Sequence, residues 1–89
     1  MQALSIKVIG RVQGVHFRQS TKAVADQLGV KGFIRNEADG SVYMEAEADE
    51  WIMENFLEWC SEGPDRAVVE ALEKKEIEVQ KFENFVIKK

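Results

Sequence analysis

The stretch Gly10–Arg18, with the sequence GRVQGVHFR, constrains the fold more than any other part of the chain. Before it, Ala3–Ile9 contains apolar residues at alternate positions, which is typical of a half-buried strand. After it, apolar residues recur at helical spacing across Phe17–Leu28. The chain is therefore predicted to run from a strand, through a turn punctuated by glycines, into a helix.

This turn has the composition of an anion-binding site. Gly10 and Gly14 can adopt backbone angles closed to other residues, so the chain can curl with successive N–H groups pointing inward. Unpaired N–H groups and the helix dipole together attract an anion to a helix N-terminus. Arg18, in the first helical turn, can donate to two oxygens of the same anion. The glycines also suit a tight connection that binds nothing, and their spacing alone does not decide between these readings.

Length and composition predict one domain spanning residues 1–89. The chain contains no apolar run of roughly 18 residues, so no membrane span is predicted. The N-terminus lacks the basic and apolar regions of a signal peptide. The single cysteine, Cys60, excludes an internal disulfide, and one Cys with one His is too few for a structural zinc site. We therefore expect a soluble cytoplasmic domain without a metal or cofactor.

The charge distribution is uneven. The net charge is −4, yet residues 1–36 contain six of the twelve basic residues and only one of the sixteen acidic residues. An acidic protein is poorly suited to binding a nucleic acid, whereas a basic third can concentrate a small anion at one site. A difference in charge between sheet and helix faces explains the same asymmetry without any ligand.

The remaining elements follow from periodicity and turn residues. We expect strands over Ala3–Ile9, Lys31–Asn36, Ser41–Ala48, Ala67–Ile77 and Phe85–Ile87, and helices over Phe17–Leu28 and Glu50–Glu62. Glu37–Gly40 is a hairpin turn, and Asp49 is a candidate N-cap. Gly29 and Gly63 are placed to end the two helices. Glu70 and the charged residues after it indicate a bend or bulge.

The element order predicts an α+β ferredoxin-like two-layer sandwich, βαββαβ with a short fifth strand. Two helices would cover one face of an antiparallel sheet. In this topology Ala3–Ile9 and Lys31–Asn36 are parallel, with Ser41–Ala48 between them. Their carboxyl ends would lie at the same edge, about 9–10 Å apart. The fold should therefore bring Asn36 close to Arg18.

GRVQGVHFR, followed by GFIRN, a DG turn and a strand led by valine, closely resembles the acylphosphatase family. The resemblance covers nearly the whole chain. It implies a ferredoxin-like fold and hydrolysis of the carboxyl–phosphate bond of acyl phosphates to carboxylate and inorganic phosphate. By the same resemblance, Arg18 binds the phosphate and Asn36 positions the attacking water. The backbone cradle would consist of Val12, Gln13, Gly14 and Val15.

Two positions depart from the pattern or bear on it. Ala48 stands where many members have glycine, which puts the local turn in question. Glu37 adds a negative charge directly after Asn36, so it is a candidate for weakening substrate binding. The cradle contacts the phosphate and little in the sequence would contact the acyl group, so we expect broad acceptance of small acyl phosphates. Nothing in the sequence argues for an oligomer, so we expect a monomer. Neither nucleic acid nor membrane is an expected partner.

The chemistry of an acyl phosphate suits this residue set. Its leaving group is a carboxylate whose conjugate acid has a pKa of about 4, so no general acid is required. The transition state is loose, and positioning and electrostatic stabilisation supply most of the catalysis. Asn36 can orient water but cannot act as a base, so we expect the proton of the water to pass to the substrate's own phosphate. His16, the only histidine, is interpreted as facing away from the cradle, and Arg11 is a candidate for attracting phosphate.

Two alternatives come from other functional classes. Lys31–Phe33 resembles the opening of the aromatic strand motif of RNA-recognition domains, but Ile34 stands where glycine or alanine is required. Together with the acidic net charge, this predicts negligible retention on heparin. The second alternative is a non-catalytic phosphate- or anion-binding module of the same fold, similar to the acylphosphatase-like domains of carbamoyl-phosphate-using maturation enzymes.

Overall fold

The computed structural model describes all 89 residues and contains five strands and two helices. In chain order they are β1 (Gln2–Arg11), α1 (Phe17–Leu28), β2 (Lys31–Asn36), β3 (Val42–Ala48), α2 (Glu50–Glu62), β4 (Val68–Glu76) and β5 (Phe85–Ile87). The bounds of both helices, β2 and β5 are those predicted. The ends of β1, β3 and β4 differ from the prediction by one or two residues.

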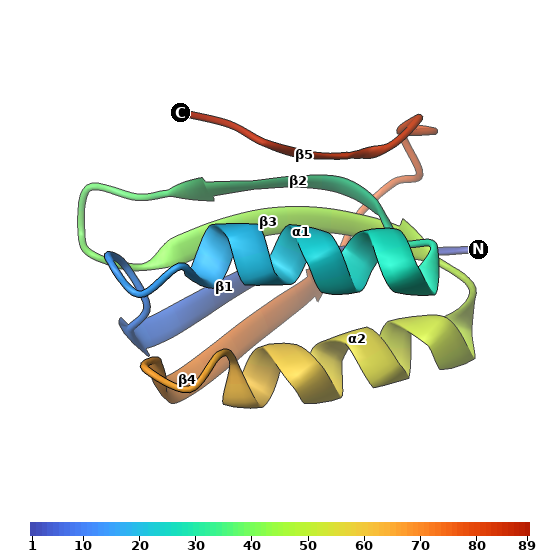
Figure 1. Cartoon of the computed structure of the whole chain (residues 1–89). Coiled ribbons are helices and arrows are strands. Elements are labelled where there is room, and N and C mark those ends of the chain that lie inside the picture. Colours follow the sequence, from blue (N-terminus) through green and yellow to red (C-terminus); the bar gives the residue numbers. More distant parts are fainter.

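The strands form one sheet in the order β4-β1-β3-β2-β5, and both helices lie on the same face of it (Figure 1). β3 lies between β1 and β2 and pairs antiparallel with both, so β1 and β2 run in the same direction. This arrangement confirms the ferredoxin-like sandwich. The sheet is antiparallel, as predicted, except at one edge, where β5 pairs parallel with β2. The chain reaches β5 from the end of the sheet where β4 finishes, so β5 must run in the direction of β2.

The hydrophobic core fills the space between the sheet and the two helices. It is a cluster of 16 buried apolar residues drawn from both layers. The rings of Phe17 and Trp59 lie 5.9 Å apart between α1 and α2, and those of Phe56 and Phe85 lie 6.1 Å apart between α2 and β5. The second contact ties the short last strand to the core. Neither helix is long and apolar enough to cross a lipid bilayer.

A bulge in β4 shapes the end of β1 from which the glycine-rich loop departs. Ile9 pairs with Ala71 and Gly10 pairs with Val69, which leaves Glu70 without a partner on β1. The bulge predicted near Glu70 is therefore confirmed. Gly10 has a φ of 140°, and a Cβ added to it would lie 2.1 Å from the carbonyl oxygen of Val68. Only glycine fits this position without displacing backbone.

The helix ends follow the predicted signals in part. Gly29 adopts the left-handed conformation, with a φ of 84°, and donates its N–H to the carbonyl of Ala25 at 2.8 Å. Gly63 ends α2 with a positive φ of 70° but a ψ of −173°, outside the left-handed helical conformation, and donates its N–H to the carbonyl of Trp59 at 2.8 Å. Asp49 occupies the N-cap position of α2, but its side chain makes no capping hydrogen bond.

On the face of the sheet opposite the helices, one carboxylate holds the connection between β4 and β5. Glu47 is only 2% exposed. Its Oε2 accepts hydrogen bonds from the backbone N–H groups of Gln80 and Lys81, and its Oε1 accepts one from that of Phe82 at 3.0 Å. Lys81 has a φ of 60°, so the loop curls around the carboxylate. Glu47 therefore serves as a structural anchor.

Candidate active site

Residues 12–16 link β1 to α1 and present unpaired backbone donors. Gly14 and His16 both have positive φ, of 74° and 61°, and His16 occupies the N-cap position without a side-chain cap. None of the N–H groups of residues 12–19 donates to a backbone carbonyl, and Ser20 is the first to do so, to the carbonyl of His16 at 3.0 Å. The free donors lie at the positive end of the α1 dipole, so this segment has the electrostatics of an anion cradle.

Arg18 and Asn36 line a single pocket of about 200 Å³ beside this loop. The expectation that the fold brings these two residues together is confirmed. The other residues that line the pocket come from the loop and the first turn of α1: Val12, Gly14, His16, Phe17 and Gln19. Figure 1 shows the loop and the β2–β3 turn at the same end of the sheet, which explains the proximity.

Asn36 reaches the pocket from the last position of β2. It pairs with Val42 of β3, which in turn pairs with Val8 of β1, so Asn36 lies in one row with the strand that leads into the loop. Its Oδ1 is buried and has no hydrogen-bond partner in the protein. A buried acceptor without a partner costs about 1–3 kcal/mol, and such atoms concentrate at functional sites. Asn36 also lines the pocket, so its carboxamide is the candidate group to contact a molecule bound there.

The four residues expected to form the cradle divide into two pairs. Val12 and Gly14 line the pocket, whereas Gln13 and Val15 do not. The side chain of Val15 packs against the core, and that of Gln13 reaches toward the β2–β3 turn. Any contribution of Gln13 and Val15 to the cradle is therefore made by their backbone. Sequence reasoning missed the contact of the Gln13 side chain, because no local pattern signals it.

The other two basic residues considered in the sequence, His16 and Arg11, differ in their relation to the pocket. His16 is exposed and contributes to the lining, so the expectation that it lies away from the cradle is not confirmed. Arg11, at the end of β1, pairs with Val68 and does not line the pocket. Arg18 is therefore the only arginine or lysine that lines it.

The two positions that raised questions in the sequence lie away from the pocket chemistry. The carboxylate of Glu37 accepts a hydrogen bond from Nε of Arg35 at 3.2 Å. Side chains alternate between the two faces of a strand, so Arg35 lies on the face opposite Asn36 and draws Glu37 there. Ala48 pairs with Gln2 at the other end of the sheet, far along β3 from the site. Neither residue lines the pocket.

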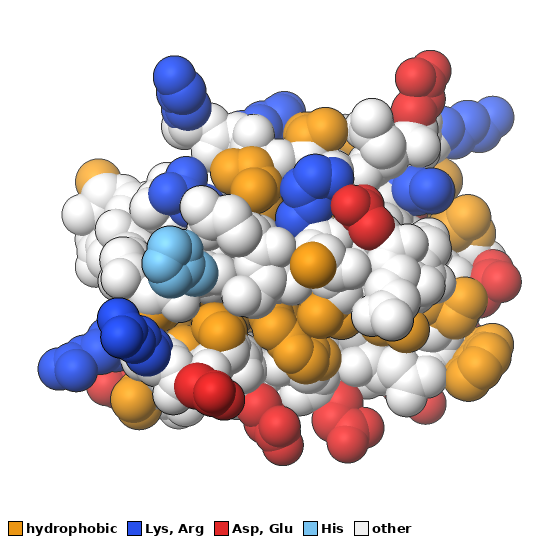
Figure 2. Space-filling model, in the orientation of Figure 1, with side chains coloured by type: hydrophobic (Ala, Val, Ile, Leu, Met, Phe, Trp, Pro, Cys, Tyr) orange, Lys and Arg blue, Asp and Glu red, His pale blue; other side chains and the backbone are white.

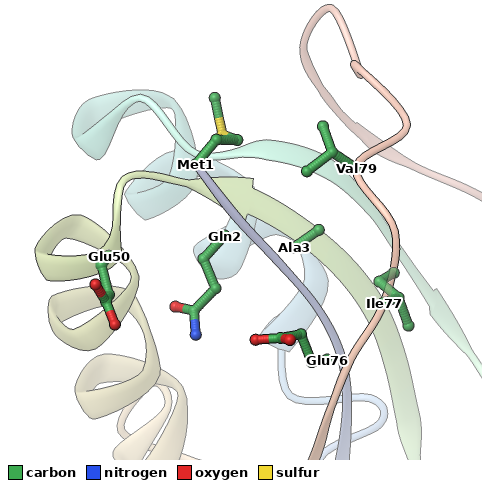
Figure 3. A pocket seen from close by; sticks show the side chains of 7 residues that line it. All are labelled: Met1, Gln2, Ala3, Glu50, Glu76, Ile77 and Val79. Carbon is green, nitrogen blue, oxygen red and sulfur yellow. The ribbon is translucent and has the colours of Figure 1, made fainter.

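A larger cavity, of about 320 Å³, lies at that other end of the sheet (Figure 3). The only charged side chains that line it are the carboxylates of Glu50 and Glu76, which disfavour an anion. Figure 2 shows blue side chains on both sides of the single histidine and red side chains along the edge formed by α2. Of these two cavities, the smaller one is better suited to an anionic ligand, because Arg18 lines it and no carboxylate does.

Together, the fold and the pocket define a ferredoxin-like domain with one arginine and a set of unpaired backbone donors at the start of its first helix. A sequence profile of the acylphosphatase family matches residues 4–87. The chain belongs to the acylphosphatase family and is an enzyme of that family. The resemblance in the sequence is thereby confirmed.

The relatives support this assignment over the full length of the chain. An acylphosphatase of Thermotoga petrophila is 47% identical over 88 residues, which cover 99% of this chain and 98% of the relative. The crystal structure of an acylphosphatase from Bacillus subtilis is 31% identical, with a TM-score of 0.97 and full coverage of both chains. Full-length HypF, in a phosphate- and nucleotide-bound form, contains a similar unit with 30% identity and a TM-score of 0.88, and the match covers 12% of HypF.

Proposed function

We propose that the protein hydrolyses the carboxyl–phosphate bond of small acyl phosphates in the pocket between the β1–α1 loop and the end of β2. One observation carries this proposal: Arg18 and Asn36 line the same small pocket as loop residues whose backbone N–H groups donate to no backbone carbonyl. The family of the chain supports the same reaction class.

In this proposal the phosphoryl group is held by positive charge and backbone donors. The guanidinium of Arg18 donates to two phosphate oxygens, because its planar geometry matches two acceptors. The backbone N–H groups of residues 12–15 donate to the remaining oxygens. These groups are fixed before the substrate arrives, so they stabilise the charge on the equatorial oxygens of a loose transition state without reorganising.

In this proposal Asn36 positions the water molecule that acts as the nucleophile. Its Oδ1 accepts a hydrogen bond from a water molecule, whose oxygen then bonds to phosphorus. The bond between phosphorus and the acyl oxygen breaks, and the electron pair leaves with the carboxylate. The proton of the water passes to a phosphate oxygen, giving inorganic phosphate. The carboxylate needs no proton at neutral pH, so the absence of a carboxyl pair at the site is no obstacle.

The test is the hydrolysis of benzoyl phosphate by the wild type, Arg18→Gln and Asn36→Ala, with a phosphomonoester as a second substrate. We expect cleavage of the acyl phosphate alone and a loss of ~100-fold or more in each variant. Arg11→Gln and Asn55→Ala are the matched controls, because both residues are exposed and neither lines the pocket. The controls should retain wild-type rates.

Two other outcomes separate the alternatives. An inactive wild type whose melting temperature still rises with inorganic phosphate would identify a non-catalytic anion-binding module. The unit within HypF makes this alternative worth testing, since the fold there is a small part of a larger protein. An inactive wild type that does not respond to phosphate would refute both functions.

The pH profile tests the route of the proton. With no protein base, activity should be flat between about pH 5 and 7, and His16→Ala should leave the profile unchanged. A sharp inflection that disappears in His16→Ala would show that the histidine, which borders the pocket, takes the proton instead.

A further inference from the structure

The side chain of Gln13 connects the β1–α1 loop to the β2–β3 turn, which is distant in the sequence but adjacent in the fold. Its Nε2 donates one hydrogen bond to the carbonyl of Glu37 and another to the carbonyl of Ser41, both at 2.8 Å. Both hydrogens of the amide are therefore used on the β2–β3 turn. No other side chain of residues 12–16 forms a hydrogen bond to that turn. Gln13 is the direct polar link between the two segments.

The turn that Gln13 binds is itself well fixed. Glu37 donates its N–H to the carbonyl of Ser41 at 2.9 Å, and Gly40 donates to the carbonyl of Glu37 at 3.2 Å. The carboxylate of Asp39 accepts the N–H of Ser41 at 2.9 Å and an ion pair from Lys7 of β1 at 3.0 Å. A rigid turn transmits the position of Gln13 to its neighbours.

The turn starts directly after Asn36, and Gln13 lies directly before Gly14 of the pocket lining. The two hydrogen bonds therefore join the loop that carries the backbone donors to the turn that follows Asn36. We propose that Gln13 is a positioning residue, which acts through Asn36 by holding the phosphate cradle and the attacking water in register. This inference rests on the proposed hydrolysis, because it concerns the geometry of that reaction.

The register matters because the two reactants are held by different segments. The loop and Arg18 hold the phosphorus, whereas β2 holds the water. A misplacement of about 1 Å between reacting groups can cost 100-fold in rate even when each group still binds its partner. Loss of the Gln13 bonds should therefore lower kcat much more than it weakens phosphate binding.

The first experiment compares Gln13→Met with Gln27→Met, in benzoyl phosphate hydrolysis and in the binding of inorganic phosphate measured by calorimetry. Methionine keeps the length of glutamine but donates no hydrogen bond. Gln27 is exposed on α1 and forms no hydrogen bond through its side chain, so it is the matched control. For Gln13→Met we expect a loss of ~10–100-fold in kcat and a change below about threefold in the Kd of phosphate. Gln27→Met should match the wild type in both.

The second experiment asks whether Gln13 acts through Asn36. In the Asn36→Ala background no side chain remains to be positioned, so Gln13→Met should lower kcat by less than about threefold. Independent, multiplicative losses in the double variant would overturn the inference. Gln13→Asn, which is too short to reach both carbonyls, serves as a second variant if Gln13→Met does not fold, and thermal unfolding of each variant verifies the fold.

The outcomes separate this inference from the function on which it rests. If the wild type does not hydrolyse benzoyl phosphate, the proposed function fails and the role of Gln13 fails with it. If the wild type is active and Gln13→Met keeps the kcat of Gln27→Met, the function stands and only the role of Gln13 is overturned. Equal losses in kcat and phosphate affinity would make Gln13 a structural part of the cradle, which also contradicts the inference.

Discussion

Replacing Glu47 with glutamine tests how strongly the anchor on the open face of the sheet stabilises the fold. The carboxylate accepts three backbone N–H groups, from Gln80, Lys81 and Phe82, and is only 2% exposed. The amide of Glu47→Gln keeps one acceptor oxygen and turns an NH₂ group toward donors that it cannot satisfy. At least one hydrogen bond to a charged acceptor is lost, and a second is weakened.

The magnitude follows from these contacts. A hydrogen bond to a charged group contributes about 1.5–3 kcal/mol, so the substitution should lower the free energy of unfolding by about 3 kcal/mol. In a domain of this size 1 kcal/mol shifts the melting temperature by about 4–8 °C, which predicts a fall of more than about 10 °C. Thermal and urea unfolding followed by circular dichroism measure both quantities.

Glu45→Gln is the control, because Glu45 lies two residues earlier on the same strand face. Its carboxylate bonds only to side chains, the hydroxyl of Tyr43 at 2.7 Å and Nε2 of Gln80 at 2.9 Å, and it is partly exposed. We expect this variant to lose about 1 kcal/mol or less. If the two variants unfold at the same temperature, the burial and backbone contacts of Glu47 do not stabilise the loop as argued.

Three further predictions concern stability and reactivity. Gly10→Ala should lower the free energy of unfolding in urea by about 2–3 kcal/mol, because the added Cβ would lie 2.1 Å from a β4 carbonyl oxygen. Gly14→Ala should lower it by less, because a Cβ at that position would meet no atom within 4 Å. The hydrogen bonds from Ser41 hold the pKa of Asp39 well below its usual range, so this carboxylate stabilises the fold above about pH 4 and less as the pH falls. Asp39→Asn should therefore melt below the wild type at about pH 6, and the gap should narrow under acid. Burial raises the pKa of the Cys60 thiol, so a thiol reagent should label it only in denaturant; fast labelling of the native protein would contradict its burial.

Local signals account for most of what the sequence predicts correctly. Gly29 and Gly63 end the helices where their residue type suggests, because both positions have a positive φ that few other residues tolerate. The two glycines of GRVQGVHFR mark the strand–helix turn for the same reason. Asn36 was placed near Arg18 by topology, since the ends of two parallel strands meet at one edge of the sheet.

What the sequence did not predict depends on contacts between distant segments. The amide of Gln13 bonds to carbonyls 24 and 28 positions away, and no spacing rule indicates such a contact. Glu47 occupies an alternating polar position that is typical of an exposed residue. It is buried because residues 80–82, much later in the chain, pack over its carboxylate. The direction of β5 likewise depends on the route of the connection from β4.

The unpaired donors of residues 12–19 have a consequence for how this site responds to mutation. Every residue type except proline carries the same N–H group, so most substitutions in the loop leave the donors themselves in place. Under the proposed mechanism, a chain that lost Asn36 would lose turnover, while its main chain would keep the donors proposed to bind the phosphate. The proposed binding of phosphate should therefore tolerate substitutions in the loop better than the proposed catalysis tolerates substitution of Asn36.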